Sequence, residues 1–271
     1  MGRLIAWMPS RREVLCAGGG GLVAVSIGLS ASAGETVARD ELAAVLQQMD
    51  LVGTFAALDV VADRLTLVNP ERAKVRFVPA STFKIPNTLI ALETGALKDA
   101  DEKFRYDGKP RPVKAWERDM TLREAITASN VPVYQELARR IGLANYRVWL
   151  DRLDYGNRET GMVLERFWLD GPLAISAVEQ VRFLALLAQG RLPASARSHA
   201  IVRDIIRNEE KDGRALFAKT GWSGKIGWWA GWIEHGDRIT TFALNIDMTA
   251  AAEAPKRIDL GKALLARLDL Y

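Results

Sequence analysis

The stretch Pro79-Ala80-Ser81-Thr82-Phe83-Lys84-Ile85-Pro86 places a hydroxyl group and an amine three residues apart, where a helix is predicted to begin. The apolar run over residues 85 to 92, ended by Gly95, predicts about three helical turns, and residues three apart lie on one face of a helix. In the first turn the backbone N–H groups lack intrahelical partners. Negative charge that develops on an attacked carbonyl near Ser81 is therefore stabilised there.

Ser81 and Lys84 admit two interpretations. A serine hydroxyl is a poor nucleophile until a base removes its proton, and Lys84 is the nearest candidate base. The alternative is structural, with a serine that caps the helix and a lysine exposed to solvent. The Ser-x-x-Lys spacing recurs by chance, so the pair alone does not decide between them.

Composition favours a globular protein without a nucleic-acid partner. The chain has 271 residues, 49% of them hydrophobic and 26% charged, which suits one large domain or two lobes. The formal charge is +4, of which Arg3, Arg11 and Arg12 against Glu13 contribute +2. Basic and acidic residues are interspersed elsewhere, and no basic stripe stands out.

Residues 1 to 33 are predicted to be a signal peptide. Ser10-Arg11-Arg12-Glu13-Val14-Leu15 resembles a twin-arginine signal, a glycine-rich apolar stretch covers residues 14 to 29, and Ala31-Ser32-Ala33 is typical of a cleavage site. The apolar stretch is short for a membrane span, so we expect no stable membrane association. We expect export to the periplasm with cleavage near Ala33; a general secretory signal is the alternative.

The only cysteine, Cys16, lies within this leader. Its removal would leave no disulfide, no thiolate metal site and no cysteine nucleophile. A lipoprotein cysteine follows the hydrophobic stretch, which Cys16 does not, so we expect no lipid anchor.

The remaining chain predicts strands near both ends and helices between them. Strands are predicted at residues 53–60, 64–68, 215–220, 226–234 and 240–247, and helices at 85–92, 122–129, 133–141, 146–153, 177–187, 199–207 and around 260–268. Residues 98–118 and 154–177 are rich in turn residues and are predicted to be loops.

This order of elements predicts an α+β fold in a single catalytic domain over residues 34 to 271. Terminal strands form an α/β lobe of residues 34–83 and 178–271, and residues 84–177 form a helical lobe. Ser81 lies at the junction, and clefts between lobes are common places for small-molecule sites.

Two further segments carry candidate chemistry. In Lys219-Thr220-Gly221, near the end of a predicted strand, a lysine and a hydroxyl can hold a substrate carboxylate, and a glycine lets a ligand approach the backbone. Ser129-Asn130-Val131 stands at a helix end before Pro132, where the structural alternative is a serine that caps the next helix.

The two histidines do not suit a Ser-His-Asp enzyme. His199 and His235 both fall in predicted turn regions, so we expect them at the surface. No Gly-x-Ser-x-Gly elbow occurs either. A serine nucleophile in this chain would therefore need a lysine as its base.

Four segments, taken in order, resemble the motifs of the class D serine β-lactamases, the oxacillinase type: Ser81-Thr82-Phe83-Lys84, Ser129-Asn130-Val131, Tyr155-Gly156-Asn157 and Lys219-Thr220-Gly221. The resemblance covers nearly all of residues 50 to 260, and four ordered motifs together are specific. It implies a serine β-lactamase and penicillin-binding-protein-like fold, with an antiparallel sheet flanked by helices and a helical lobe. It also implies small β-lactam substrates.

The resemblance implies that Ser81 is the acyl-forming nucleophile and that Lys84 is carbamylated by carbon dioxide to N6-carboxylysine. An ordinary lysine with a pKa of about 10.4 is protonated at neutral pH. Burial lowers that pKa, a neutral amine can add carbon dioxide, and the carbamate is an anionic general base. No metal and no other cofactor is implied.

The resemblance also assigns roles around these two residues. Trp168 would donate its indole N–H to the carbamate, and Val131 and Leu169 would complete an apolar wall. Ser129 would relay a proton to the departing ring nitrogen.

Lys219, Thr220 and Arg257 would hold the substrate carboxylate, with Arg257 assigned by its distance from the predicted strand that ends at residue 247. The backbone N–H groups of Ser81 and Trp222 would form the oxyanion hole. The hairpin segment 222 to 226 is short, which leaves the substrate spectrum open.

Two other activities share these motifs. A penicillin-binding sensor domain acylates without turnover, and a cell-wall transpeptidase or carboxypeptidase acylates on peptide substrates. Class A β-lactamases instead use a glutamate in a Glu-x-x-Leu-Asn loop, which is absent from this sequence. A class D enzyme is the preferred interpretation, without a prediction of oligomeric state.

Overall fold

The computed structural model describes residues 34–271. The predicted signal peptide over residues 1 to 33 lies outside the described residues. Among the residues described, no helix combines the length and apolar character that crossing a bilayer requires.

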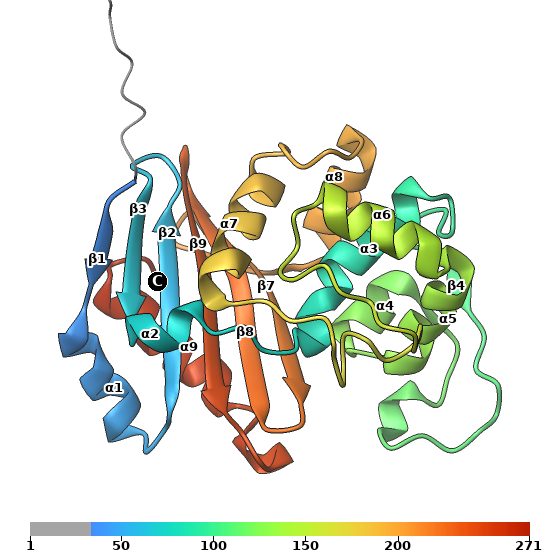
Figure 1. The fold of residues 1–271 in the computed structure, drawn as a ribbon, viewed down its shortest axis with the longest axis horizontal. Coiled ribbons are helices and arrows are strands. Elements are labelled where there is room, and N and C mark those ends of the chain that lie inside the picture. Colours follow the sequence, from blue (N-terminus) through green and yellow to red (C-terminus); the bar gives the residue numbers. More distant parts are fainter. Residues whose placement is uncertain (1–33) are drawn as a thin grey trace, which may run out of the picture. The chain divides into compact units, whose positions relative to one another are not determined.

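Within residues 34–271, seven strands form one sheet whose order is β1-β3-β2-β9-β8-β7-β6 (Figure 1). The strands are β1 (Thr36–Ala38), β2 (Gly53–Asp59), β3 (Arg64–Val68), β6 (Arg207–Lys211), β7 (Arg214–Ser223), β8 (Ile226–His235) and β9 (Arg238–Asp247). Neighbours are antiparallel except the parallel pair of β1 and β3. A separate two-stranded ribbon pairs β4 (Lys103–Phe104) with β5 (Met120–Thr121).

Helices cover both faces of the sheet and build a second lobe beside it (Figure 1). The helices are α1 (Ala43–Gln48), α2 (Pro70–Lys74), α3 (Lys84–Glu93), α4 (Leu122–Thr127), α5 (Val131–Ile141), α6 (Leu143–Arg152), α7 (Ala177–Ala188), α8 (Ala196–Ile205) and α9 (Lys256–Arg267). Short 3-10 turns are η1 (Asp40–Leu42), η2 (Ala80–Phe83), η3 (Lys114–Trp116) and η4 (Ala251–Glu253). The prediction of an α+β fold with an antiparallel sheet flanked by helices and a helical lobe is confirmed.

Strand β8 shows why the sheet needs helices on both faces. Successive strand side chains point to opposite faces, so Trp228 and Trp232 join the core under α7, whereas Trp229 joins the core under α9. The strand is therefore apolar except for its last two residues, Glu234 and His235. Helix α9 approaches so closely that a Cβ added at Gly261 would lie 2.1 Å from a Trp229 ring atom.

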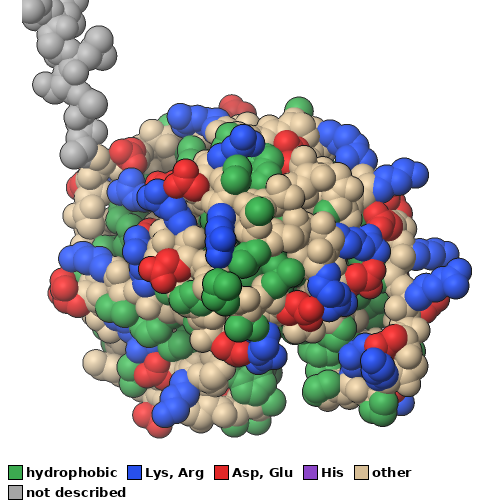
Figure 2. Space-filling model, turned by 45° about the vertical axis from the view of Figure 1, so that its right-hand side comes forward, with side chains coloured by type: hydrophobic (Ala, Val, Ile, Leu, Met, Phe, Trp, Pro, Cys, Tyr) green, Lys and Arg blue, Asp and Glu red, His purple; other side chains and the backbone are tan. Residues whose placement is uncertain are grey.

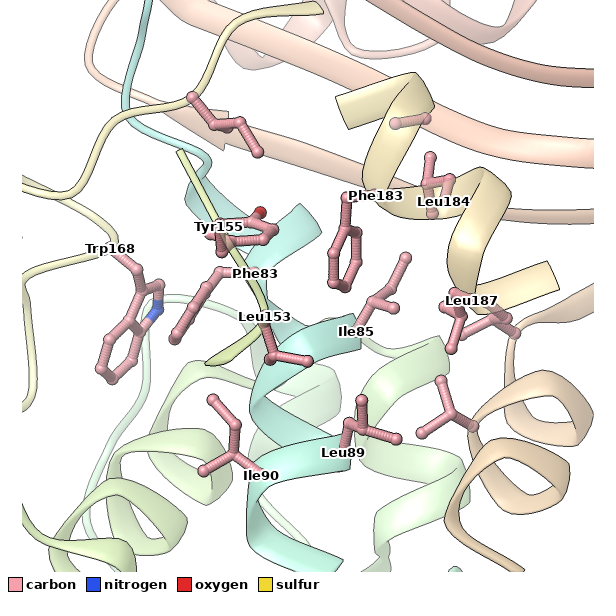
Figure 3. Packing of buried hydrophobic residues seen from close by; sticks show 14 of the residues in the cluster. Phe83, Ile85, Leu89, Ile90, Leu153, Tyr155, Trp168, Phe183, Leu184 and Leu187 are labelled. Carbon is pink, nitrogen blue, oxygen red and sulfur yellow. The ribbon is translucent and has the colours of Figure 1, made fainter. Parts of the chain in front are cut away.

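Phe83 anchors the junction between η2 and the helical lobe. Its ring lies 5.7 Å from that of Trp168 and 5.3 Å from that of Phe167, with Tyr155 and Tyr146 also in contact. Figure 3 shows Phe83, Tyr155 and Trp168 beside the first turns of α3. This packing holds the start of α3 rigidly against the loop that carries Trp168.

The elements that the sequence did not predict are short or polar. Strand β6 reads Arg-Asn-Glu-Glu-Lys, which has no apolar alternation because the strand is a largely exposed edge of the sheet. Helix α8 accordingly ends at Ile205, and the predicted helix over residues 199–207 extends too far. Strand β1 and helices α1 and α2 were likewise missed.

The expectation that both histidines are surface residues is wrong for His199. His235 is exposed, but His199 is only 8% exposed and its Nε2 lies 3.2 Å from the Leu192 carbonyl oxygen. Helix α8 begins at Ala196, earlier than predicted, and this places His199 on its inward face with Ser198 and Val202.

Candidate active site

The hydroxyl group of Ser81 and the amine of Lys84 are in direct contact. Ser81 lies in η2, Lys84 is the first residue of α3, and Lys84 Nζ lies 2.8 Å from Ser81 Oγ. The preceding residue, Ala80, has a positive φ of 49°, and its N–H donates to the Trp168 carbonyl oxygen at 2.9 Å. Such a backbone conformation is sparsely populated and persists where the surroundings hold it in place.

Lys84 is buried rather than exposed, with 1% of its surface accessible. Burial, and secondarily the charge of Lys219, hold the pKa of Lys84 well below its usual value, and no carboxylate within residues 34–271 opposes this. The Tyr134 ring centroid lies 5.0 Å from Lys84 Nζ. Such surroundings favour the neutral amine, which can accept a proton or react with an electrophile.

Trp168 brings an unpartnered donor to the same cluster. Its side chain is fully buried, and its indole Nε1 has no hydrogen-bond partner among the described residues. Leaving such a donor unsatisfied costs about 1–3 kcal/mol, so an acceptor is expected beside it. Val131 and Leu169 belong to the same large hydrophobic cluster as Trp168.

Ser129 is joined across the two lobes to the motif Lys219-Thr220-Gly221. It lies between α4 and α5 with φ of 53°, and Lys219 Nζ donates to its Oγ at 3.1 Å. The structural alternative for Ser129 does not apply, because the side chain of Asn130 accepts the Val133 N–H at 3.2 Å and caps α5. Ser129 Oγ is therefore available beside a lysine.

Lys219 is itself an unusual cation. It is 7% exposed, and burial, followed by the charge of Arg257, lowers its pKa to about 7. Its Nζ also donates to the carbonyl oxygen of Thr220 at 3.0 Å. Because no acidic side chain in the described part of the chain offsets these charges, an anionic ligand would stabilise the protonated form.

Arg257 reaches the same strand from α9. It donates to the carbonyl oxygens of Gly221 and of Ala254, the latter at 3.0 Å, and it is 8% exposed. Burial lowers its pKa. With Lys219 and the half-buried Thr220, it forms a group of donors around β7 that suits a carboxylate.

Gly221 lets β7 pass directly over the Ser81 backbone. A Cβ added there would lie 3.0 Å from the Pro79 carbonyl oxygen and 3.2 Å from the Ser81 nitrogen. A larger residue would push the strand away from η2. The next residue, Trp222, is 40% exposed at the strand's end.

In the part of the chain that the structure describes, the edge of β7 that faces β6 is unpaired near Lys219 and Thr220. Strand β6 pairs with β7 only as far as Phe217, and within residues 34–271 no strand pairs with that edge beyond it. Figure 2 shows basic and acidic side chains interspersed over the face drawn, with a notch at its lower edge.

The Tyr155-Gly156-Asn157 motif holds the loop that presents Trp168. Gly156 has φ of 56°, and a Cβ there would lie 2.2 Å from the Ala174 carbonyl oxygen. The Asn157 side chain donates to the Pro172 carbonyl oxygen at 2.8 Å and accepts the Ala174 N–H at 3.0 Å. These contacts hold the two ends of the loop together.

Gln180 is a positioning residue that the sequence did not reveal. It lies on α7, is 2% exposed, and donates to Thr82 Oγ1 at 2.9 Å, while Thr82 Oγ1 donates to the Pro79 carbonyl oxygen at 2.7 Å. A glutamine on the inward, otherwise apolar face of a predicted helix was the available signal.

Comparison with known proteins places these motifs in one family. The family model described as penicillin binding protein transpeptidase domain matches residues 59–266. Beta-lactamase OXA-5 of Pseudomonas aeruginosa is 41% identical over 221 residues, covering 79% of this chain and 83% of that protein. Beta-lactamase OXA-48 of Klebsiella pneumoniae is 46% identical over 184 residues, covering 66% and 69% respectively.

Solved structures agree with the sequence matches. The class D beta-lactamase FUS-1 (OXA-85) from Fusobacterium nucleatum subsp. polymorphum superposes with a TM-score of 0.84 at 40% identity, covering 86% of this chain and 99% of that one. The class D beta-lactamase YbXI from Nostoc gives a TM-score of 0.83 at 34% identity, covering 86% and 100%. The family model spans every predicted site residue from Ser81 to Arg257.

Proposed function

This chain belongs to the class D β-lactamases, within the penicillin-binding-protein transpeptidase family, and we therefore propose that it hydrolyses the β-lactam ring of penicillin-type antibiotics through an acyl-enzyme on Ser81. The observation that carries the proposal is the 2.8 Å contact between Ser81 Oγ and the Nζ of the fully buried Lys84. A buried neutral amine beside a hydroxyl is what a serine nucleophile without a histidine requires.

Acylation begins with the substrate carboxylate held by Lys219, Thr220 and Arg257. Ser81 Oγ gives its proton to the base on Lys84 and forms a bond to the lactam carbonyl carbon. The carbonyl oxygen becomes anionic, and the backbone N–H groups of Ser81 and Trp222 stabilise it. These donors cost no reorganisation, because η2 and β7 are already held in contact.

Collapse of this intermediate breaks the ring C–N bond. The electron pair stays on nitrogen, which takes a proton from Ser129 Oγ, and Lys219 restores that proton through the 3.1 Å contact. Before deacylation the base on Lys84 releases to solvent the proton that it took from Ser81, and Lys219 takes one up. A water then gives its proton to the base on Lys84 and adds to the ester carbonyl. Ser81 then recovers its proton as the ring-opened acid leaves.

A carbamate on Lys84, formed from carbon dioxide with loss of one proton, would supply an anionic oxygen as the general base. The surroundings fit such a group. Lys84 is buried with a lowered pKa, and the Trp168 indole N–H lacks an acceptor among the described residues. We infer no metal and no further cofactor.

Turnover separates this enzyme from a penicillin-binding sensor domain. Purified protein incubated with a penicillin and a chromogenic cephalosporin is expected to hydrolyse many equivalents of each. Ser81→Ala should abolish hydrolysis without unfolding the protein, and mass spectrometry of the wild type should show an acyl adduct on the Ser81 peptide. A single stoichiometric adduct without turnover would identify a sensor, and an adduct on another residue would overturn the assignment.

We also propose that residues 1 to 33 are a twin-arginine leader that delivers the enzyme to the periplasm. The Arg11-Arg12 pair before a weakly hydrophobic stretch supports this. Mature protein should begin near residue 34, and replacing both arginines with lysine should stop export. Unchanged export of that variant would favour a general secretory signal.

A further inference from the structure

Two consecutive carbonyl groups of the loop that carries Trp168 are hydrogen-bonded to elements outside the loop. The Trp168 carbonyl oxygen accepts the N–H of Ala80 at 2.9 Å, and the Leu169 carbonyl oxygen accepts the hydroxyl group of Ser223. Ala80 belongs to η2, the turn that presents Ser81, whereas Ser223 is the last residue of β7. The backbone at Trp168 is therefore held by the nucleophile's turn and by the end of β7.

Of these two contacts, only the one from Ser223 is made by a side chain. The Ala80 contact joins backbone to backbone and does not depend on the side chain of either residue. Within residues 34–271, no other side chain of β7 or β8 hydrogen-bonds the loop over residues 154–176, and no backbone hydrogen bond joins them. The polar connection between this loop and the β7–β8 hairpin therefore depends on a single hydroxyl group.

Strand geometry explains why Ser223 faces the loop. Side chains alternate between the two faces of a strand, so residues four apart point the same way. Lys219, four residues before Ser223, reaches across to Ser129 in the helical lobe. Ser223 lies on that same face, and the residue it meets there is Leu169, 54 positions away in the chain.

The hairpin that presents Ser223 is short and well supported. Ser223 is still paired with β8, opposite Ile226, so only Gly224 and Lys225 join the two strands. The Lys225 carbonyl oxygen accepts the Met248 N–H at 2.7 Å, which holds the turn to the segment after β9. The hydrogen bond from Ser223 therefore restrains the loop against a hairpin that is itself fixed.

The restrained carbonyl directly follows the residue that brings the unpartnered donor to Lys84. Figure 3 shows the Trp168 ring beside that of Phe83, and Trp168 is fully buried. A hydrogen bond requires a narrow range of distances and angles between donor and acceptor. Rotation of the backbone at Leu169 would redirect the indole N–H, so the Ser223 contact fixes the direction of this donor.

We propose that Ser223 is a positioning residue for the base on Lys84, because its bond to Leu169 holds the Trp168 indole N–H where it stabilises a carbamate. The inference rests on the proposed function, in which the neutral Lys84 amine forms a bond to the carbon of carbon dioxide and loses one proton to solvent. Without the Ser223 hydroxyl group this reaction still occurs. Its reversal, in which the carbamate takes up a proton and releases carbon dioxide, becomes more favourable.

The bicarbonate concentration that gives half-maximal activity tests this role. In buffer depleted of carbon dioxide and then supplied with bicarbonate, Ser223→Ala should need about fivefold more bicarbonate than wild type, as expected for the loss of one net hydrogen bond. Excess bicarbonate should restore the wild-type kcat. Ser223→Thr keeps the hydroxyl group and should match wild type. At low ¹³C-labelled bicarbonate, the carbamate signal should be weaker in Ser223→Ala than in wild type.

Thr54→Val is the matched control for a loss of stability. Thr54 is fully buried on β2, which contributes no residue to the site, and its hydroxyl group donates to the Val68 carbonyl oxygen at 2.6 Å. This variant also loses a bond from a hydroxyl group to a backbone carbonyl. It should lower Tm at least as much as Ser223→Ala without changing the half-maximal bicarbonate concentration. An equal rise in that concentration for both variants would overturn the proposal, because lost stability would explain it.

A double-mutant cycle tests whether Ser223 acts through Trp168. Trp168→Phe removes the indole N–H, so adding Ser223→Ala to that variant should cause no further rise in the half-maximal bicarbonate concentration. Two residues that act through one donor are not additive. The same rise in both backgrounds would overturn the proposal.

Two further results would contradict the proposed role of Ser223. One is an unchanged half-maximal bicarbonate concentration in Ser223→Ala. The other is a fall in kcat that excess bicarbonate does not restore, which would place the effect on the neighbouring oxyanion donor, the Trp222 N–H. Failure of the proposed function would look different. Wild-type protein would then turn over no β-lactam, or would take up no label and show no response to bicarbonate, and the inference would fall with it.

Discussion

Lys219 Nζ lies 3.1 Å from Ser129 Oγ, although the two residues are 90 positions apart in the chain. The contact joins β7 to the turn between α4 and α5. It makes the proposed proton donor and the proposed carboxylate-binding cation a single unit, so that a change in the charge of Lys219 affects both roles.

The first prediction concerns the charge on Lys219. Because its pKa is about 7 in the free protein, kcat/KM for penicillins should fall as pH rises through about 7, since that parameter reports ionisation of the free enzyme. Lys219→Arg keeps its charge at all these pH values, and should flatten this alkaline limb even if it lowers the overall rate. If the alkaline limb of the pH profile has the same shape in Lys219→Arg as in wild type, the ionisation of a group other than Lys219 causes it.

The second prediction concerns stability. In the unfolded chain a lysine has a pKa of about 10.4, whereas in the folded protein the pKa of Lys219 is about 7. Between about pH 7 and pH 10 the unfolded state therefore binds more protons, and the free energy of unfolding rises with pH over that window. Thermal unfolding at pH 6.5 and pH 9 should show a smaller rise in Tm for Lys219→Met than for wild type. Equal rises would contradict the lowered pKa.

The third prediction tests the base on Lys84. Trp168→Phe removes the unpartnered indole N–H and keeps an aromatic ring, so activity should fall and should be partly restored by added bicarbonate. Trp149→Phe, another tryptophan of the helical lobe, is the control and should show neither effect. Lys84→Ala should lose activity and any bicarbonate response.

The carbamate can also be observed directly. Active protein incubated with ¹³C-labelled bicarbonate should show a carbamate carbon by NMR, and Lys84→Ala should not. If active wild-type protein takes up no label and its rate never responds to bicarbonate, Lys84 acts as a free amine.

The fourth prediction concerns Arg257. Its charge is present in the ground and transition states alike, so Arg257→Ala should raise KM for penicillins more than it lowers kcat. Arg257→Lys should recover only part of the loss, because an ammonium group lacks the planar two-pronged donor of a guanidinium. A KM for Arg257→Ala equal to that of wild type would remove Arg257 from the substrate site.

The fifth prediction concerns Gly261 in α9, where we expect alanine to be less stable than glycine, the reverse of the usual preference in a helix. Glycine to alanine inside a helix ordinarily stabilises by about 1 kcal/mol, yet Gly261→Ala places a methyl group 2.1 Å from a Trp229 ring atom. Overpacking of this kind costs about 1–3 kcal/mol, so chemical denaturation should show a less stable variant. Trp229→Leu in the same chain should recover part of the loss, and a variant more stable than wild type would show that α9 can move away freely.

Much of the fold could be predicted from local pattern. The alternation that makes β8 apolar on both faces, and the apolar run that follows Lys84, are properties of neighbouring residues and are visible in the sequence. Strand β6 could not be predicted, because an exposed edge strand needs only backbone pairing with β7 and leaves no apolar signature.

The residue types of the site were also visible in the sequence, since Ser81 and Lys84 are one helical turn apart and the other motifs could be identified by their resemblance. The sequence did not show whether Lys84 is an exposed, protonated lysine or a buried one with a lowered pKa. Its pKa depends on the exclusion of water by side chains from distant segments, such as Tyr134. His199 was wrongly expected at the surface because α8 begins earlier than the sequence predicted, which turns this residue inward.

By itself, then, the sequence determined most of the longer helices and strands, the family motifs and the candidate nucleophile, because these depend on neighbours within a few residues. Tertiary structure alone decided that Lys219 meets Ser129 and that Gly221 lies against the Ser81 backbone. Contacts of this kind, and the desolvation that shifts a pKa, arise when segments far apart in the chain pack together and displace water.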